Sequence, residues 1–289
     1  MEINKNTKIL IVGLGLIGGS YAQALSDEGF EVGAIARRNE TLTQALERGW
    51  IKHGCTEIDG DYISQFDLVV FALYPHIFLE WIKNNQQHLK PGALLTDVTG
   101  VKRCVVYKVQ DMLRDDLEYI GAHPMAGRER SGLEFATKEV FKGANYIVTP
   151  TDKNTAEAIA ICEELGRTLG FKTVSRLTPE EHDEMVGFLS ELTHVIAVAL
   201  MVCKDSTKLA DYTGDSFREL TRIAKINDAM WAELFILNKD ELVRQIDIFD
   251  DKISHLRECI VNEDTDTMRE MMRLSCERRE FFDKERNGK

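Results

Sequence analysis

The first part of the chain alternates short apolar runs with amphipathic stretches. Apolar runs of roughly four to eight residues are typical of buried strands, and apolar residues at three- and four-residue spacing are typical of helices. The predicted strands are Lys8–Val12, Glu31–Ala36, Asp67–Leu73, Ala93–Asp97, Glu118–Ala122, Asn145–Thr149 and Phe171–Ser175. The predicted helices between them are Gly18–Glu28, Glu40–Arg48, His76–His88, Lys102–Arg114 and Thr155–Leu169. This alternation predicts βαβ units and a mostly parallel sheet.

Beyond Leu177 the pattern is helical throughout. Thr178-Pro179-Glu180-Glu181 has the residues of a helix start, with an N-cap threonine, a proline at the first helical position and a capping-box glutamate. Apolar residues then recur at helical spacing in Met185–Val202, Phe217–Ile226, Met230–Phe249 and Ile253–Met272. We therefore predict two domains, residues 1–177 and 178–289. Long apolar helices often bury one another across a two-fold axis, which predicts a homodimer.

Composition excludes several classes of protein. The net charge of −12 disfavours nucleic acid as a partner, because phosphate binding requires a basic surface. The six cysteines are scattered with no Cys-x-x-Cys pair, which argues against a disulfide scaffold and against a zinc or other metal site. Charged residues or histidine interrupt the apolar runs, and the N-terminal residues do not resemble a signal peptide, so we expect a cytoplasmic protein with no membrane partner.

A glycine-rich turn follows the first predicted strand. The segment Gly13-Leu14-Gly15-Leu16-Ile17-Gly18 leaves a strand and opens a helix, which is the context in which this pattern binds a dinucleotide. Gly13 permits the tight turn, Gly15 lets the backbone approach a pyrophosphate, and Gly18 lets helix and strand pack closely. Leu16 and Ile17 complete the candidate cofactor site at the helix start. The fold class that follows is a Rossmann-type nucleotide-binding α/β domain followed by an all-α domain.

The end of the second predicted strand indicates which cofactor is bound. NAD sites carry an acidic residue there, which binds the ribose 2′-hydroxyl. This chain has Ala36-Arg37-Arg38-Asn39 instead, and the guanidinium groups of Arg37 and Arg38 suit a 2′-phosphate. We therefore predict NADP. NAD is the alternative, in which the two arginines only begin a solvated helix.

Three residues are candidates for substrate chemistry. His123 lies at the end of a predicted strand, where ligands meet open α/β sheets, and a neutral imidazole can accept a proton from a hydroxyl. His194 lies among apolar residues of a helix and is by itself more typical of a core residue. Arg222 is also flanked by apolar residues, and a cation there needs an anionic partner. Four other histidines are expected to be exposed or structural: His53, His76, His88 and His182.

Four segments together resemble the prephenate/arogenate dehydrogenase family of tyrosine biosynthesis. They are Gly-Leu-Gly-Leu-Ile-Gly-Gly-Ser at 13–20, His-Pro-Met-Ala-Gly at 123–127, Leu-Thr-His at 192–194, and Thr-Arg-Ile-Ala-Lys with Met-Trp within 221–231. The resemblance implies a nucleotide-binding domain, a helical dimerisation domain and a short form without a regulatory domain. It also implies oxidative decarboxylation of prephenate to 4-hydroxyphenylpyruvate.

The resemblance also implies roles for individual residues. His123 would accept the proton of the ring 4-hydroxyl as hydride passes to the nicotinamide. His194 and Arg222 would hold the substrate, Arg222 through a carboxylate. Ser131 would belong to the wall of the same pocket.

Two adjacent residues bear on the choice of substrate. Arg128 would add a cation near the pocket, which favours dianionic prephenate over arogenate. Glu129 lies where the resemblance places side-chain specificity, and its charge favours the ammonium group of arogenate. On balance prephenate is expected, with arogenate as the alternative.

One position departs from the family pattern. The family often has a serine shortly before a lysine that follows the strand at 93–97, and Gly100 stands there in this chain. Thr99, one position away, is the candidate to supply the catalytic hydroxyl instead. A non-catalytic NADP-binding sensor and a β-hydroxyacid dehydrogenase are the rival interpretations. The second is disfavoured because the helix at 185–202 offers His194 and no lysine.

Overall fold

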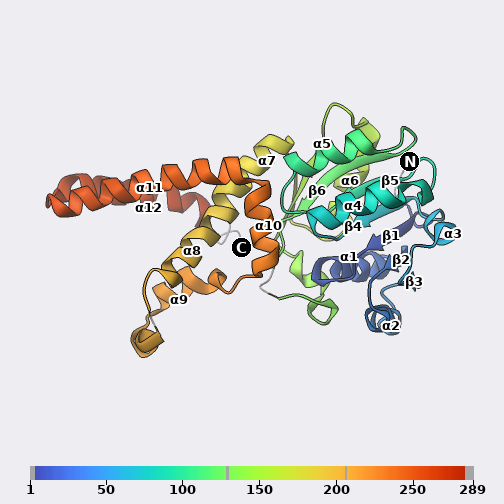
Figure 1. The fold of residues 1–289 in the computed structure, drawn as a ribbon, viewed down its shortest axis with the longest axis horizontal. Helices are drawn as coiled ribbons and strands as arrows, with labels where there is room; N and C mark the ends of the chain where they lie inside the picture. Colours follow the sequence, from blue (N-terminus) through green and yellow to red (C-terminus); the bar gives the residue numbers. More distant parts are fainter. Residues whose placement is uncertain (1–3, 128–129, 206, 284–289) are drawn as a thin grey trace. The chain divides into compact units, whose positions relative to one another are not determined.

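A computed structural model describes residues 4–127, 130–205 and 207–283 (Figure 1). The chain divides into two compact units, residues 1–239 and 240–289. All the candidate site residues belong to the first unit.

Eight strands form one sheet, in the order β3-β2-β1-β4-β5-β6-β7-β8. Their bounds are β1 Lys8–Val12, β2 Glu31–Ile35, β3 His53–Cys55, β4 Leu68–Phe71, β5 Leu94–Asp97, β6 Glu118–Pro124, β7 Asn145–Thr149 and β8 Thr173–Arg176. Neighbouring strands are parallel except β6 and β7, which are antiparallel. Strand order reverses between β1 and β4, so a dinucleotide is expected at the carboxyl ends of these strands. This sheet, with helical residues after it, confirms the predicted fold class.

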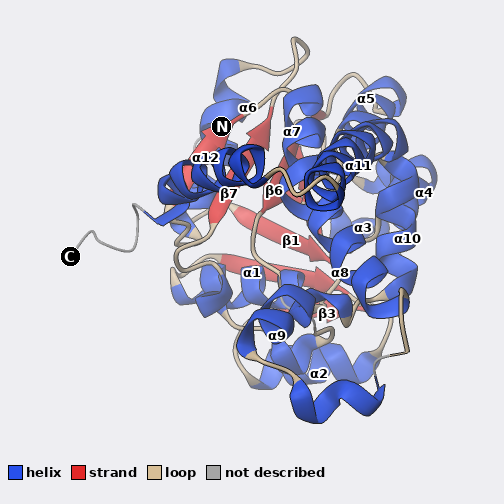
Figure 2. Cartoon of the chain, turned by 90° about the vertical axis from the view of Figure 1, so that its left-hand side faces the viewer, coloured by secondary structure: helices blue, strands red, loops and turns tan. Residues whose placement is uncertain are grey.

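Helices cover both faces of the sheet, as Figure 2 shows with strands in red and helices in blue. One face packs against α1 Leu16–Asp27, α2 Asn39–Glu47 and α6 Ala156–Thr168; the other packs against α3 Gly60–Ile63, α4 Pro75–Asn85 and α5 Arg103–Met112. Ile9 and Ile11 join the first core, whereas Leu10 and Val12 join the second. Because successive side chains alternate between faces, a strand buried on both faces must be apolar throughout.

Short 3₁₀ turns connect some of these elements: η1 Gln86–His88, η2 Leu133–Phe135 and η3 Lys138–Val140. The first unit continues with α7 Pro179–Val186, a π-helical turn η4 Gly187–Glu191, α8 Leu192–Val202, η5 Thr207–Tyr212, α9 Asp215–Thr221, η6 Arg222–Ala224 and α10 Asp228–Leu237. The second unit consists of α11 Lys239–Val261, whose first residue belongs to the first unit, and α12 Thr265–Asp283. The capping box at the start of α7 is confirmed, since the Thr178 side chain accepts from Glu181 N and the Glu181 side chain accepts from Thr178 N.

Several predicted elements differ from the structure. The pattern missed β3 and α3, which are too short to show a period. The helix predicted over Met230–Phe249 is wrong, because Asn238 interrupts it between α10 and α11. The Asn238 amide donates to Asp183 O and Glu191 Oε2, at 3.0 and 2.8 Å, so contacts with distant residues end α10 there.

The stretch Pro179–Val202 is the one helical segment, among the described residues, that is long and apolar enough to cross a membrane by length and composition. Glu191 and His194 interrupt this run as expected, but among residues 185–202 they are the only acidic, basic or histidine residues, so the interruptions do not keep the segment below the length and composition needed to cross a membrane. The Glu191 side chain is buried, and its Oε2 accepts a hydrogen bond from the Asn238 amide, which gives this polar group a partner inside the protein.

Candidate active site

The glycine turn lies at the reversal of strand order, between β1 and α1. Gly13 has φ +101°, and a Cβ there would lie 2.4 Å from Ala72 O. A Cβ at Gly18 would lie 1.9 Å from Gly13 O, so no side chain fits at either position. Gly15 differs, because a Cβ there would meet no atom within 4 Å. The turn therefore leaves the N-terminus of α1 open to a phosphate group, and its residues fit a pyrophosphate.

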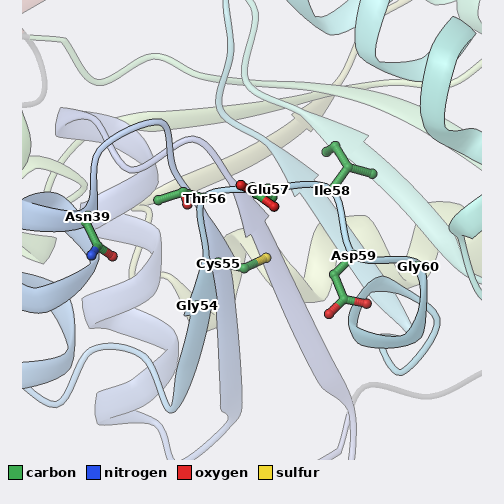
Figure 3. Close-up of a pocket in the computed structure, with 8 residues that line it drawn as sticks. All are labelled: Asn39, Gly54, Cys55, Thr56, Glu57, Ile58, Asp59 and Gly60. Atoms are coloured by element: carbon green, nitrogen blue, oxygen red, sulfur yellow. The ribbon is translucent and has the colours of Figure 1, made fainter.

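A pocket of about 620 Å³ lies beside the ends of β2 and β3 (Figure 3). Its lining residues are Asn39 and the segment 54–60. Arg37 and Arg38 are exposed just before Asn39, and Arg38 is the N-cap residue of α2. Glu57 and Asp59 line the pocket from the β3–α3 segment, where Asp59 already caps α3 by accepting from Asp61 N and Tyr62 N. The pocket is thus lined by two carboxylates, and two arginines directly precede its residue Asn39, near the end of β2, where a dinucleotide fold places the adenosine ribose.

His123 lies in β6, which runs one residue past it, and is half-buried. Its Nδ1 is 2.9 Å from Nε2 of His182, which comes from α7. The His182 ring is completely buried, and its Nδ1 is 2.8 Å from Oδ1 of Asp183. From the sequence, His182 is expected to be exposed or structural, and it is buried. Nothing in the sequence indicated its contact with His123. Its position after a capping box was the one signal for a fixed location.

Burial sets the protonation of both imidazoles. Desolvation lowers the pKa of His123 well below its usual value, and electrostatic interactions with His182 and Lys102 lower it further. Desolvation also lowers the pKa of His182, against the opposing effect of the Asp183 hydrogen bond. Both rings are therefore neutral near pH 7, and a neutral imidazole can act as a general base.

A buried ion pair holds the end of β5 beside His123. Asp97 Oδ2 lies 2.7 Å from Lys102 Nζ, and neither side chain has any exposed surface. Asp97 Oδ1 accepts from Tyr119 OH at 2.8 Å and from Ala122 N at 3.2 Å. Because Ala122 directly precedes His123, this carboxylate fixes the backbone that carries the imidazole.

The Thr99 hydroxyl belongs to this charged cluster. It donates to Asp97 Oδ2 and receives a 3.2 Å hydrogen bond from Lys102 Nζ. Gly100 is the residue that faces the imidazole, since a Cβ there would lie 4.0 Å from His123 Cε1 and 3.5 Å from Leu234 Cδ1. A catalytic role for Thr99 stays a prediction, which this placement does not support.

His194, which is expected to hold the substrate, lies on α8 and contacts α10. His194 is half-buried in α8 and stacks on Trp231 of α10, with ring centroids 3.7 Å apart. The His194 Nδ1 is 2.8 Å from Ser190 O. Trp231 lies one helical turn before Leu234, which is the residue beside Gly100. A single turn of α10 thus links the surroundings of His194 to those of His123.

The remaining predicted site residues differ in their placement. Arg222 is exposed at the start of η6, which packs against α8. Ser131 is exposed in the segment between β6 and η2. Arg128 and Glu129 lie outside the described residues. Across the described ranges, no three His, Cys, Asp or Glu side chains are grouped to hold a metal ion.

Comparisons with known proteins match most of the chain. The family described as "Prephenate dehydrogenase, nucleotide-binding domain" matches residues 21–175, and "Prephenate dehydrogenase, dimerization domain" matches residues 178–274. A prephenate dehydrogenase of Bacillus subtilis is 27% identical over 267 residues, covering 90% of this chain and 72% of that protein.

Two solved structures are similar over nearly their full length. One is prephenate dehydrogenase from A. aeolicus in complex with hydroxyphenyl propionate and NAD+, with a TM-score of 0.87 and 29% identity, covering 97% of this chain and 100% of that chain. The other is Synechocystis arogenate dehydrogenase, with a TM-score of 0.83 and 25% identity, covering 96% of this chain and 100% of that chain.

Proposed function

Because the chain belongs to the prephenate dehydrogenase family, we propose that it oxidises prephenate with decarboxylation to 4-hydroxyphenylpyruvate and uses NADP as the oxidant. The enzyme is a pyridine-nucleotide-dependent oxidoreductase. The observation that carries the substrate chemistry is His123, a neutral imidazole at the carboxyl edge of the nucleotide-binding sheet.

The proposed reaction assigns each side chain one task. A bound nicotinamide supplies the hydride acceptor. His123 accepts the proton of the ring hydroxyl while the hydride leaves the same ring carbon. The bond to the ring carboxylate then breaks and releases carbon dioxide. Its electron pair completes the aromatic ring, and the ring oxygen takes back the proton from His123 to give the 4-hydroxyl of the product. Arg222 binds a substrate carboxylate, and His194 holds the substrate from the side of α8.

Arogenate is the second candidate substrate. It differs from prephenate in carrying an amino group in place of the side-chain ketone. The similarity to Synechocystis arogenate dehydrogenase supports arogenate as the alternative substrate. Arg128 favours prephenate and Glu129 favours arogenate, as argued from the sequence.

NADP is proposed over NAD because Arg37 and Arg38 follow β2, where an NAD site carries an acid. Guanidinium groups bind a 2′-phosphate with charge-assisted hydrogen bonds. Glu57 is the feature that favours NAD. It lines the pocket beside the ends of β2 and β3, and its carboxylate can accept a hydrogen bond from a ribose hydroxyl.

A cytoplasmic homodimer, with functional domains at 1–177 and 178–289, completes the proposal. The match to a dimerisation domain supports the dimer. Large apolar side chains of α11 and α12 are exposed, including Ile260, Val261 and Phe281 at 60%, 64% and 69%. A second copy of the chain would remove such surface from water.

The test mixes purified protein with prephenate and NADP and follows the absorbance of the reduced cofactor. Arogenate and NAD are run in parallel at matched concentrations. Turnover of prephenate with a lower KM for NADP than for NAD is expected. Turnover of neither prephenate nor arogenate would overturn the function, and a marked preference for NAD would overturn only the cofactor assignment.

A further inference from the structure

Within the part of the chain that the structure describes, the Asp183 carboxylate is hydrogen-bonded to three nitrogen atoms. Its Oδ1 accepts from Lys102 N at 2.8 Å and lies 2.8 Å from His182 Nδ1, and its Oδ2 accepts from Arg103 N at 2.9 Å. A carboxylate has no proton to donate, so His182 Nδ1 carries the proton of this hydrogen bond.

The protonation of His182 determines that of His123. A neutral imidazole has one N–H and one lone pair, so the lone pair of His182 is on Nε2. That atom lies 2.9 Å from His123 Nδ1. His123 Nδ1 must therefore donate, because two facing lone pairs leave both nitrogens without a partner in a buried site. The lone pair of neutral His123 is then on Nε2, which points away from His182.

The surroundings hold this chain of hydrogen bonds in one geometry. The His182 side chain has no exposed surface, so water does not compete for its nitrogens. Asp183 is held by the backbone at the start of α5, and Asn238 Nδ2 donates to its carbonyl oxygen at 3.0 Å. Gly100, the residue near Cε1 of His123, contributes no side chain to hold the ring. The orientation of His123 therefore depends on the His182 side.

We propose that His182 and Asp183 are positioning residues that fix His123 in the tautomer whose Nε2 accepts the substrate proton, an inference that rests on the proposed function. As His123 takes up that proton, its Nδ1–H stays bonded to His182, whose own Nδ1–H stays bonded to Asp183. The Asp183 carboxylate then stabilises the imidazolium through the intervening ring, in the manner of the aspartate in a serine-protease triad. The other charged groups near the two rings are Lys102 and Asp97.

The first test reads the tautomer of His123 directly. Long-range ¹H–¹⁵N spectra of ¹⁵N-histidine-labelled protein, without substrate, distinguish a protonated from an unprotonated ring nitrogen, and a His123→Asn sample assigns the resonances. We expect His123 protonated on Nδ1 and unprotonated on Nε2 at pH 7. Protonation on Nε2 would overturn the proposal. This measurement needs no turnover, so its result can be distinguished from a failure of the proposed function.

The second test reverses the chain of hydrogen bonds. Asp183→Asn removes the carboxylate charge. Where its amide nitrogen takes the position of Oδ1, giving up the hydrogen bond from Lys102 N, it donates to His182 Nδ1 and so moves the His182 proton to Nε2 and the His123 proton to Nε2. We expect kcat to fall by about 10²- to 10⁴-fold with little change in KM, and the spectrum to show the other His123 tautomer. Wild-type kcat with an unchanged tautomer would overturn the proposal.

Two variants of His182 separate positioning from packing. His182→Phe keeps a buried ring and removes both hydrogen bonds, and we expect kcat to fall about 10- to 100-fold, a part of what a general base contributes. In His182→Gln the amide oxygen can accept from His123 and the amide nitrogen can donate to Asp183, so kcat is expected to stay within about tenfold of wild type. Equal kcat in both variants would overturn the positioning role.

His53→Gln is the matched control, since His53 is exposed on β3 and lies outside this chain of contacts. NADP affinity, measured by fluorescence titration, is expected to be unchanged in all these variants, because the nucleotide binds at the β1–α1 turn. Loss of NADP affinity together with activity would identify a general loss of structure and overturn a specific role for His182.

Discussion

Replacing Asp97 with asparagine perturbs the buried charge cluster beside His123. Every group that contacts the Asp97 carboxylate is a donor: Lys102 Nζ, Thr99 N, Thr99 Oγ1, Tyr119 OH and Ala122 N. The two hydroxyls can turn to accept, but backbone N–H groups cannot, so an asparagine amide in either orientation directs an N–H group at the N–H of Thr99 or of Ala122. It also leaves the completely buried Lys102 ammonium without a counter-charge.

The size of the effect follows from this burial. Removing one partner of a buried ion pair costs about 3–5 kcal/mol. For a chain of this size, about 1 kcal/mol lowers the midpoint of thermal unfolding by about 2–4 °C, so Asp97→Asn is expected to lower it by about 6–20 °C.

A variant of Lys102, the other member of the ion pair, distinguishes loss of the Asp97 charge from a general sensitivity of the core to substitution. Lys102→Met leaves Asp97 with its donors from Thr99, Tyr119 and Ala122, so its cost is expected to be smaller than that of Asp97→Asn. Both variants are compared with wild type by differential scanning calorimetry at pH 7. A midpoint for Asp97→Asn within about 2 °C of wild type, or a larger loss in Lys102→Met, would refute the account of the cluster.

Three further predictions concern the reaction and its pH dependence. His123→Asn is expected to keep NADP affinity and lower kcat by about 10²- to 10⁴-fold in the cofactor-absorbance assay, and wild-type kcat in this variant would reassign the base. Arg222→Ala is expected to raise KM more than it lowers kcat, as for a group that binds ground and transition states alike, and an unchanged KM would contradict that role. Because burial lowers the pKa of His123 well below its value of about 6.5 in an unfolded chain, the unfolded state takes up protons first as pH falls. The urea midpoint should therefore decline below about pH 6.5, and His123→Asn should reduce the decline; an equal decline in both proteins would contradict the shift.

Local sequence determined much of this protein. The strand at Lys8–Val12 and the strand at Asn145–Thr149 have the bounds that their apolar runs predict, and the capping box at Thr178 forms as predicted. These features depend on interactions within a few residues, or on burial of both faces of one strand, so the order of residues is enough to predict them. The glycine turn belongs with these features, because Gly13 has a positive φ, which is a local backbone property that glycine adopts without steric cost.

Tertiary structure decided how the candidate site is assembled. His123 and His182 are 59 residues apart, and nothing in the period of either segment indicates that β6 and α7 meet. Asn238 ends a helix through contacts with Asp183 and Glu191, although the apolar pattern continues across it. The Thr99 hydroxyl joins Asp97 and Lys102 because the turn after β5 brings them together, and Gly100 is left to face the imidazole. The sequence by itself thus predicted a nucleotide-binding turn and the histidine that we propose for the reaction. Only the packing of distant elements decided which groups surround that histidine, because those contacts depend on how helices and strands pack rather than on local spacing.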